Sequence, residues 1–99
     1  MNCNVEKNGE SYTVLLSGRL DTMTAPQFEE KIGEALENAK ALTLDLQNLE
    51  YISSAGLRVI LLMQKTMDKK GKMKLIHVPQ SVLEIFEITG FSEFLTIED

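Results

Sequence analysis

The start of the chain has the apolar pattern of two paired strands. One short strand is predicted around Val5, and a second at positions 12–16, where aromatic, β-branched and aliphatic residues follow one another. Between them stands Asn8-Gly9, a dipeptide that favours a tight hairpin turn because both residues tolerate positive φ. This region therefore predicts a β-hairpin.

Apolar residues then recur at the spacing of an α-helix, with glutamates between them. The apolar stripe consists of Phe28, Ile32, Leu36 and Ala39. Before it, Thr24 has a proline two residues later and Gln27 three residues later, which matches the cap and first turn of a helix. We therefore predict an amphipathic helix that begins after Thr24 and buries one face.

The rest of the chain predicts two more helices, each between strands. Residues 41–46, 73–78 and 94–97 are short and strand-like, whereas the continuous apolar run at 57–63 fits either a strand or a buried helix. The serines before this run and Lys70-Gly71 after it favour a helix. A capping box, Ser81 to Glu84, opens the last helix, which Gly90 closes. The order β-β-α-β-α-β-α-β predicts an α/β fold, a mixed sheet of four to five strands covered by three to four α-helices.

Composition points to one globular domain spanning residues 1–99, with 43% hydrophobic and 25% charged residues. The single cysteine, Cys3, has no partner for an internal disulfide and suits a reducing compartment. No apolar stretch approaches the roughly 20 residues that cross a bilayer, and the first residues do not resemble a signal peptide. We therefore expect a cytoplasmic protein without membrane insertion.

The charge balance argues against nucleic acid as a partner. Ten basic and fifteen acidic residues give a net charge of -5, so a basic partner would suit the chain better. No phosphate-binding loop, dinucleotide-binding motif or Cys/His ligand spacing is present, so no cofactor or metal is expected. The only histidine, His77, is predicted on a different strand from the candidate serines, so we expect no enzyme.

Two adjacent serines, Ser53 and Ser54, stand between the third predicted strand and the second predicted helix. Backbone N–H groups at a helix start have no intrahelical partner, and the helix dipole is positive there. One reading is that a serine only caps the helix, which contributes about 1 kcal/mol. The other is that a phosphate on a serine is held by these free donors. Both readings are compatible.

This segment resembles the signature loop of the STAS family, the anti-sigma factor antagonists, whose loop reads Asp-Ser-Ser/Thr-Gly-Leu. Aligning Gly56-Leu57 with that pattern makes Ser54 the phosphorylated residue. Here Ser53 replaces the family's acid, and Ala55 replaces its second hydroxyl residue. Further similarity lies in Ser17-Gly18-Arg19-Leu20-Asp21, Leu44-Asp45-Leu46 and Thr89-Gly90-Phe91.

The resemblance implies an anti-sigma factor antagonist that is a monomer when free. Its unphosphorylated form would bind an anti-sigma factor that is also a serine kinase, and so release a sigma factor. Phosphorylation of Ser54 would switch it off, and a PP2C-type phosphatase would reset it. The expected partner surface comprises Asp21, Met23, Ser53, Ser54, Gly56, Leu57 and Arg58.

Several of these residues have two readings. Asp21 either braces its own turn or also helps to form the partner surface. Arg58 is either a solvent-facing helix residue or a counter-charge for a phosphoserine. Gly56 costs about 1 kcal/mol relative to alanine inside a helix, so either a neighbouring loop or a partner approaches its backbone closely. Met23 and Leu57 would supply adaptable apolar contact.

Two other functions stay open. The alternative is a STAS adaptor or scaffold module of a transporter or larger signalling assembly, in which the serines merely close a loop. Genomic neighbours distinguish these cases, since a serine kinase and a sigma factor favour the switch. The other possibility is a domain that binds a small ligand or nucleotide, which calorimetric titration with purine nucleotides tests.

Overall fold

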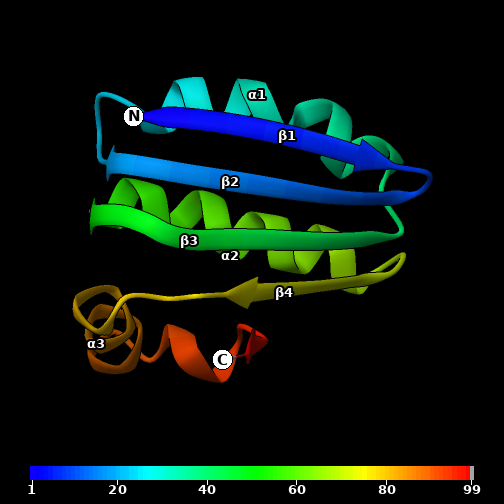
Figure 1. Ribbon diagram of the computed structural model, residues 1–99. Coiled ribbons are helices and arrows are strands. Elements are labelled where there is room, and N and C mark those ends of the chain that lie inside the picture. The colour runs from blue at the N-terminus through cyan, green and yellow to red at the C-terminus, as the bar shows by residue number, and fades with distance from the viewer. Residues whose placement is uncertain (99) are drawn as a thin grey trace.

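The N-terminal hairpin forms one edge of a five-stranded sheet (Figure 1). In the computed structural model, which describes residues 1–98, β1 (Asn2–Asn8) and β2 (Ser11–Leu20) pair antiparallel, and Gly9 takes the positive φ that the turn requires. Next come β3 (Ala41–Ile52), β4 (Lys72–Ile76) and β5 (Ile97–Glu98), each parallel to its neighbour. The strand order is therefore β1-β2-β3-β4-β5, and the sheet is mixed.

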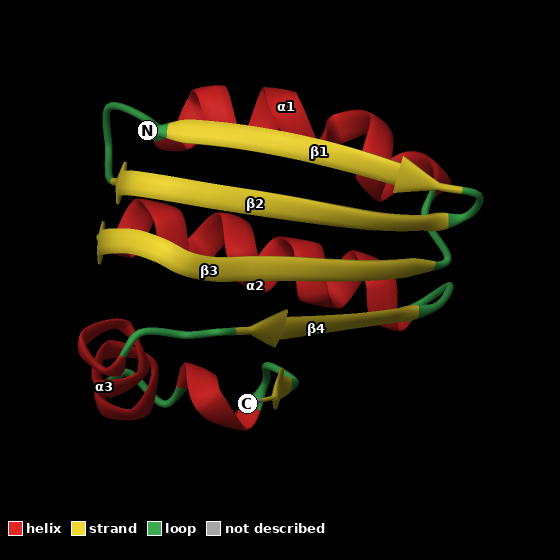
Figure 2. Ribbon diagram, in the orientation of Figure 1, coloured by secondary structure: helices red, strands yellow, loops and turns green. Residues whose placement is uncertain are grey.

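Two long helices, α1 (Ala25–Asn38) and α2 (Ser54–Asp68), lie behind the same face of the sheet (Figure 2). Each is the crossover between two parallel strands. A shorter helix, α3 (Gln80–Ile88), lies beside the carboxyl end of β3 and is followed by a 3₁₀ turn, η1 (Phe91–Glu93). The expected α/β fold is confirmed. No helix within residues 1–98 is long and apolar enough to span a bilayer.

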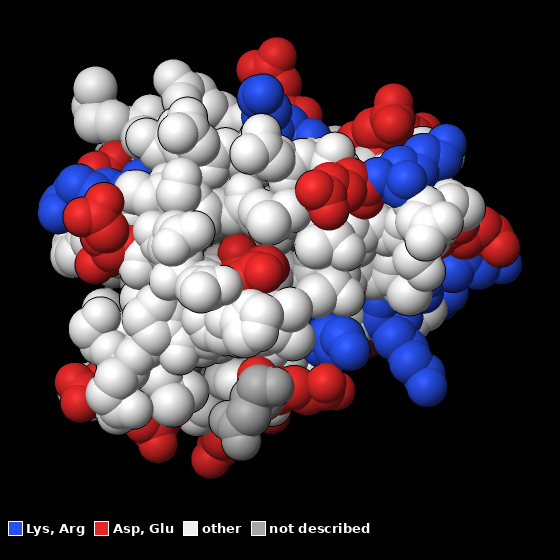
Figure 3. Space-filling view, viewed as in Figure 1, with Lys and Arg blue, Asp and Glu red and all other residues white. Residues whose placement is uncertain are grey.

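The core fills the space between the sheet and the two long helices. Alternate residues of the strands point into it, among them Val14, Leu44 and Leu75, and Phe28 and Ile60 meet them from the helices, all completely buried. The other face of the sheet is open and carries few charges (Figure 3). The parallel strands therefore have one face buried in the core and one face toward solvent.

Three details of the sequence prediction are wrong. The last strand is Ile97–Glu98 rather than 94–97, because the N–H groups of Phe94 and Leu95 bond back to the carbonyl of Phe91 and continue the turn of η1. The third helix begins at Gln80, so Ser81 lies inside the helix instead of capping it. Thr24 makes no side-chain cap, since its Oγ1 donates to the carbonyl of Arg19 and accepts the N–H of Asp21, both at 2.9 Å.

Candidate functional site

The two loops that carry the predicted site follow the carboxyl ends of the neighbouring strands β2 and β3, at the same end of the sheet. Leu20 lies opposite Ile52 at the ends of the parallel strands β2 and β3. The N–H of Ser53 donates to the carbonyl of Leu20 at 2.9 Å, which ties the start of α2 to the turn after β2. The structure therefore brings the Asp21 turn and the two serines together.

Ser54 is the first residue of α2 and is exposed. The first N–H of the helix with a backbone partner belongs to Leu57, which donates to the carbonyl of Ser53 at 2.9 Å. Within residues 1–98, the N–H groups of Ser54, Ala55 and Gly56 have no hydrogen-bond partner. An anion at this point would meet unused donors and the positive end of the helix dipole.

Ser53 occupies the N-cap position with extended backbone angles (φ -101°, ψ 176°) but makes no side-chain cap. Its Oγ is buried and has no hydrogen-bond partner among residues 1–98. The prediction that a serine side chain caps this helix is therefore wrong. The two hydroxyl groups differ in environment, because Ser54 is exposed whereas the Oγ of Ser53 is enclosed.

Asp21 braces the turn between β2 and α1. Its Oδ1 accepts the N–H groups of Met23 (3.0 Å) and Thr24 (3.2 Å) and lies 3.3 Å from Oγ1 of Thr24, whose proton is shared with the nearer carbonyl of Arg19. Partial burial raises the pKa of Asp21, but these hydrogen bonds and the Arg19 charge outweigh it, so the pKa lies below its ordinary value. The side chain stays 28% exposed, so the turn-bracing role is real and still leaves part of the carboxylate accessible.

Gly56 and Leu57 do not belong to the exposed surface. A Cβ on Gly56 would lie 2.6 Å from Cγ of Leu20 and 3.0 Å from Cγ1 of Ile52. The close approach that the sequence indicated thus comes from the ends of β2 and β3. Leu57 is only 4% exposed because it packs in the core, so its expected role as a surface contact is wrong.

Met23 and Arg58 are exposed as the partner surface requires. Met23 is 82% exposed in the Asp21 turn. Arg58 lies four residues after Ser54 on α2, which places both on one side of the helix. Their functional roles remain predictions.

The sequence did not predict a stacked pair at this end of the sheet, formed by Arg19 and Tyr51. The guanidinium carbon of Arg19 lies 4.3 Å from the ring centroid of Tyr51, and Nε of Arg19 lies 3.8 Å from Oδ2 of Asp21. The only available signal was that each residue precedes a core residue at a strand end, Leu20 or Ile52, and so faces away from the core.

His77 does not approach the serines as a base. Its Nδ1 lies 3.2 Å from Oδ1 of Asp45, on the sheet. Ser54 has no hydrogen-bonded base anywhere in residues 1–98. Nucleophilic catalysis by Ser54 therefore has no structural support.

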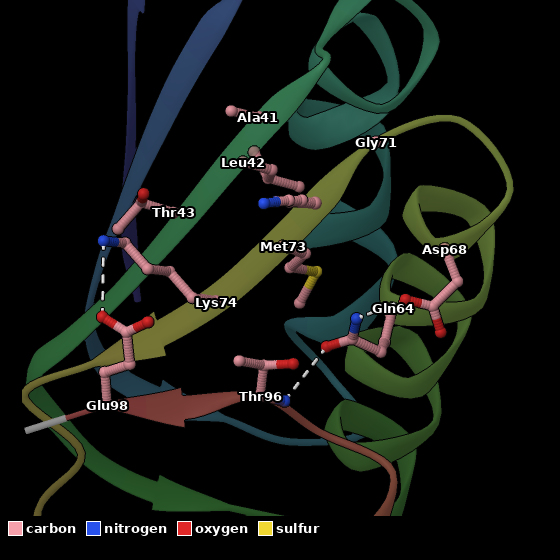
Figure 4. A pocket seen from close by; sticks show the side chains of 11 residues that line it. Ala41, Leu42, Thr43, Gln64, Asp68, Gly71, Met73, Lys74, Thr96 and Glu98 are labelled. Atoms are coloured by element: carbon pink, nitrogen blue, oxygen red, sulfur yellow. Dashed lines mark hydrogen bonds and ion pairs between the residues drawn. The ribbon is translucent and has the colours of Figure 1, made fainter.

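A cavity of about 380 Å³ lies at the other end of the sheet, between α2 and the first residues of β3 and β4 (Figure 4). In its wall, the buried Gln64 donates to Asp68 at 2.9 Å and accepts the N–H of Thr96 at 3.3 Å. Lys72 and Lys74 also line it. None of the residues predicted for the partner surface lines this cavity.

Comparison with known sequences agrees with this geometry. The sequence model described as "Mlab, STAS domain" matches residues 3–97. BtrV of Bordetella bronchiseptica is 38% identical over 78 residues, which are 77% of this chain and 67% of BtrV. The anti-sigma-B factor antagonist of Bacillus subtilis is 29% identical over 98 residues, 98% of this chain and 90% of the relative. The chain therefore belongs to the STAS domain family.

Solved structures share the fold. An anti-sigma factor antagonist from Mycobacterium paratuberculosis superposes with a TM-score of 0.87 at 24% identity, covering 97% of this chain and 83% of its own. The Bacillus cell fate determinant SpoIIAA in its phosphorylated form gives a TM-score of 0.77 at 18% identity, covering 99% and 92%. At these identities the likeness concerns the fold.

Proposed function

We propose that this STAS domain is an anti-sigma factor antagonist switched by phosphorylation of Ser54. Its unphosphorylated form binds an anti-sigma factor that is also a serine kinase, and this frees a sigma factor. The observation that carries the proposal is the exposed Ser54 at the start of α2, beside three backbone N–H groups without partners in residues 1–98. Such a site accepts a phosphate without any catalytic group of its own.

The relatives support this assignment. The B. subtilis relative that spans almost the whole chain is named an anti-sigma-B factor antagonist. A protein of the same fold, SpoIIAA, has been solved in its phosphorylated form. A phosphate-carrying state is thus compatible with this fold in another member.

In the proposed mechanism, the bound kinase transfers the γ-phosphoryl group of ATP to Oγ of Ser54, which releases ADP and the hydroxyl proton. The phosphate rests against the free amides of α2, while Arg58, one turn along the helix, offers a counter-charge. The fold keeps its shape, and the added charge blocks the interface. A PP2C-type phosphatase hydrolyses the phosphoester and restores the binding form.

In this account the chain is a ligand and a substrate, not a catalyst. It acts in the cytoplasm and is a monomer until it meets its partner. The partner surface consists of the exposed part of the Asp21 turn with Met23, the start of α2 and Arg58.

The test is phosphorylation by the anti-sigma factor encoded in the same genome, with ATP and mapping of the phosphosite by mass spectrometry. Wild type and Ser53→Ala should be labelled at Ser54, whereas Ser54→Ala should stay at background. Equal labelling of Ser54→Ala, with Ser53→Ala blank, would show that the acceptor is Ser53. Absence of both binding and labelling in the wild type would reject the switch.

One observation favours a second function, a STAS adaptor or scaffold module. The acid and the second hydroxyl residue of the family loop are replaced by Ser53 and Ala55. In an adaptor, the start of α2 serves only to close the loop after β3. A gene neighbourhood of transporter subunits, together with unlabelled wild-type protein, would support this function instead.

A further inference from the structure

Arg19 and Tyr51 form a stacked pair next to the candidate switch loop. The two residues lie opposite each other at the ends of β2 and β3, one position before the Leu20 and Ile52 pair. The guanidinium lies over the ring at 4.3 Å from the centroid, within the range of a cation–π contact. The side chain of Arg19 remains 62% exposed, and Tyr51 is 38% exposed.

The stack holds a long, flexible side chain in one orientation. A free arginine loses rotamer entropy when it binds a partner, and a side chain already ordered by its own protein loses less. The ring lies on one side of the guanidinium group, and the rest of the Arg19 side chain remains exposed to solvent. Arg19 is therefore a preorganised cation on the surface.

The neighbouring Asp21 does not occupy the hydrogen-bond donors of Arg19. Oδ1 of Asp21 accepts two hydrogen bonds, from the backbone N–H groups of Met23 and Thr24. Its Oδ2 lies 3.8 Å from Nε of Arg19, which is a charge contact but too long for a hydrogen bond. The charge of Asp21 is thus compensated within the turn, while the side-chain donors of Arg19 make no hydrogen bond within residues 1–98 and are available to a partner.

We infer that Arg19 anchors an acidic side chain of the anti-sigma factor and thereby helps to select the partner, with Tyr51 as its positioning residue. The inference rests on the proposed function and deepens it. Arginine and tyrosine are enriched among residues that dominate binding energy, and bidentate pairing with a carboxylate gives such a contact its geometry. The surface proposed around Ser54 thus extends across the end of the sheet to Tyr51.

The test measures the affinity of unphosphorylated variants for the anti-sigma factor of the same genome by calorimetry. Arg19→Glu should weaken binding by roughly a hundredfold and Arg19→Ala by about tenfold. Arg19→Lys, which keeps the charge without the planar fork, should fall between Arg19→Ala and wild type. Tyr51→Phe should match wild type because the stack persists, whereas Tyr51→Ala should weaken binding.

The chain offers a matched control at the opposite end of the sheet. Lys7 also lies over a tyrosine, with Nζ 5.9 Å from the ring centroid of Tyr12. Lys7→Glu makes the same sign reversal, so it should leave the affinity unchanged. Melting temperatures establish that each variant is folded.

The outcomes separate the inference from the function on which it rests. If wild type binds and Arg19→Glu binds equally well or more tightly, the acidic anchor is wrong while the antagonist function stands. If wild type does not bind at all, both fail. Restoration of Arg19→Glu binding by an acid-to-lysine change in the partner would identify the paired carboxylate and confirm the inference.

Discussion

The turn after β2 and the start of α2 are neighbours, yet they satisfy their polar groups in opposite ways. The turn is closed on itself, since Asp21 accepts two backbone N–H groups and the hydroxyl of Thr24 donates to the carbonyl of Arg19. The start of α2 leaves three amides and the Oγ of Ser53 without partners in residues 1–98. The turn after β2 is therefore stabilised by its own hydrogen bonds, whereas the start of α2 keeps donors that are unpaired within the described residues and available to an added group.

Packing explains how α2 remains a helix without a cap. A serine cap contributes about 1 kcal/mol, whereas full burial of one large apolar side chain contributes about 1.5–3 kcal/mol. Leu57, Ile60 and Met63 are at most 4% exposed on the face that meets the sheet. A change of charge at the start of α2 therefore leaves the helix in place, because packing against the core stabilises it.

The largest expected effect concerns the packing beneath the open loop. Gly56→Ala should lower the free energy of unfolding by about 1–3 kcal/mol, because the new Cβ meets the buried side chains of Leu20 and Ile52. Gly33→Ala is the matched control, since a Cβ on this α1 glycine has nothing within 4 Å and should stabilise the helix. Denaturant unfolding measures both. A Gly56→Ala protein as stable as wild type would contradict this packing.

A moderate effect is expected in the closed turn. Asp21→Ala should lower the melting temperature by less than Gly56→Ala, because it removes the acceptor of two backbone hydrogen bonds on a partly exposed turn. Asp21→Asn, which keeps an acceptor oxygen, should lower the melting temperature by less than Asp21→Ala does. An affinity for the anti-sigma factor that falls more than stability does would place Asp21 on the partner surface as well, whereas unchanged affinity would restrict it to the turn.

The pH dependence of this effect has a defined sign. The folded pKa of Asp21 lies below its ordinary value of 3.8, so its charge stabilises the fold fully above that value. This contribution is lost as the pH falls through the lower, folded pKa. The stability difference between wild type and Asp21→Ala should therefore be constant near neutral pH and narrow below pH 3.8. A difference that widens in acid would contradict the role of the charge.

The smallest effect is expected for Ser53→Ala. Since the Oγ of Ser53 makes no capping bond, its removal should change the free energy of unfolding by no more than about 0.5 kcal/mol. A serine that caps its helix would lose about 1 kcal/mol in the same experiment. A loss of that size in thermal or denaturant unfolding would show that Ser53 caps α2 in solution.

The element order was predictable from the sequence because apolar periodicity reports which face of an element is buried. The helix caps were not predictable, because the hydrogen-bond partner of a hydroxyl depends on groups that come close only in the folded structure. Thr24 fits the sequence pattern of a cap, but the preceding turn offers its Oγ1 two better partners. Leu57 was placed on the surface by analogy, whereas its position on α2 turns it into the core.

The Arg19–Tyr51 stack depends on strand register, which the sequence does not specify. Leu15 pairs with Asp45, so an unbroken register would place Arg19 opposite Leu49. Two irregularities, between Leu15 and Ser17 and between Gly18 and Arg19, shift the pairing so that Tyr51 lies opposite instead. The partner surface that we propose therefore includes a feature that sequence patterns alone do not reveal.

The central claim is that a phosphate on Ser54 changes the interface and leaves the fold intact. The direct measurement compares phosphorylated with unphosphorylated protein, by amide NMR spectra for the fold and by calorimetry with the anti-sigma factor for binding. We predict spectral changes confined to the start of α2 and the Asp21 turn, with affinity lowered about a hundredfold, which corresponds to about 2.7 kcal/mol. Spectral changes across the whole sheet, or an affinity that phosphorylation does not alter, would contradict the account.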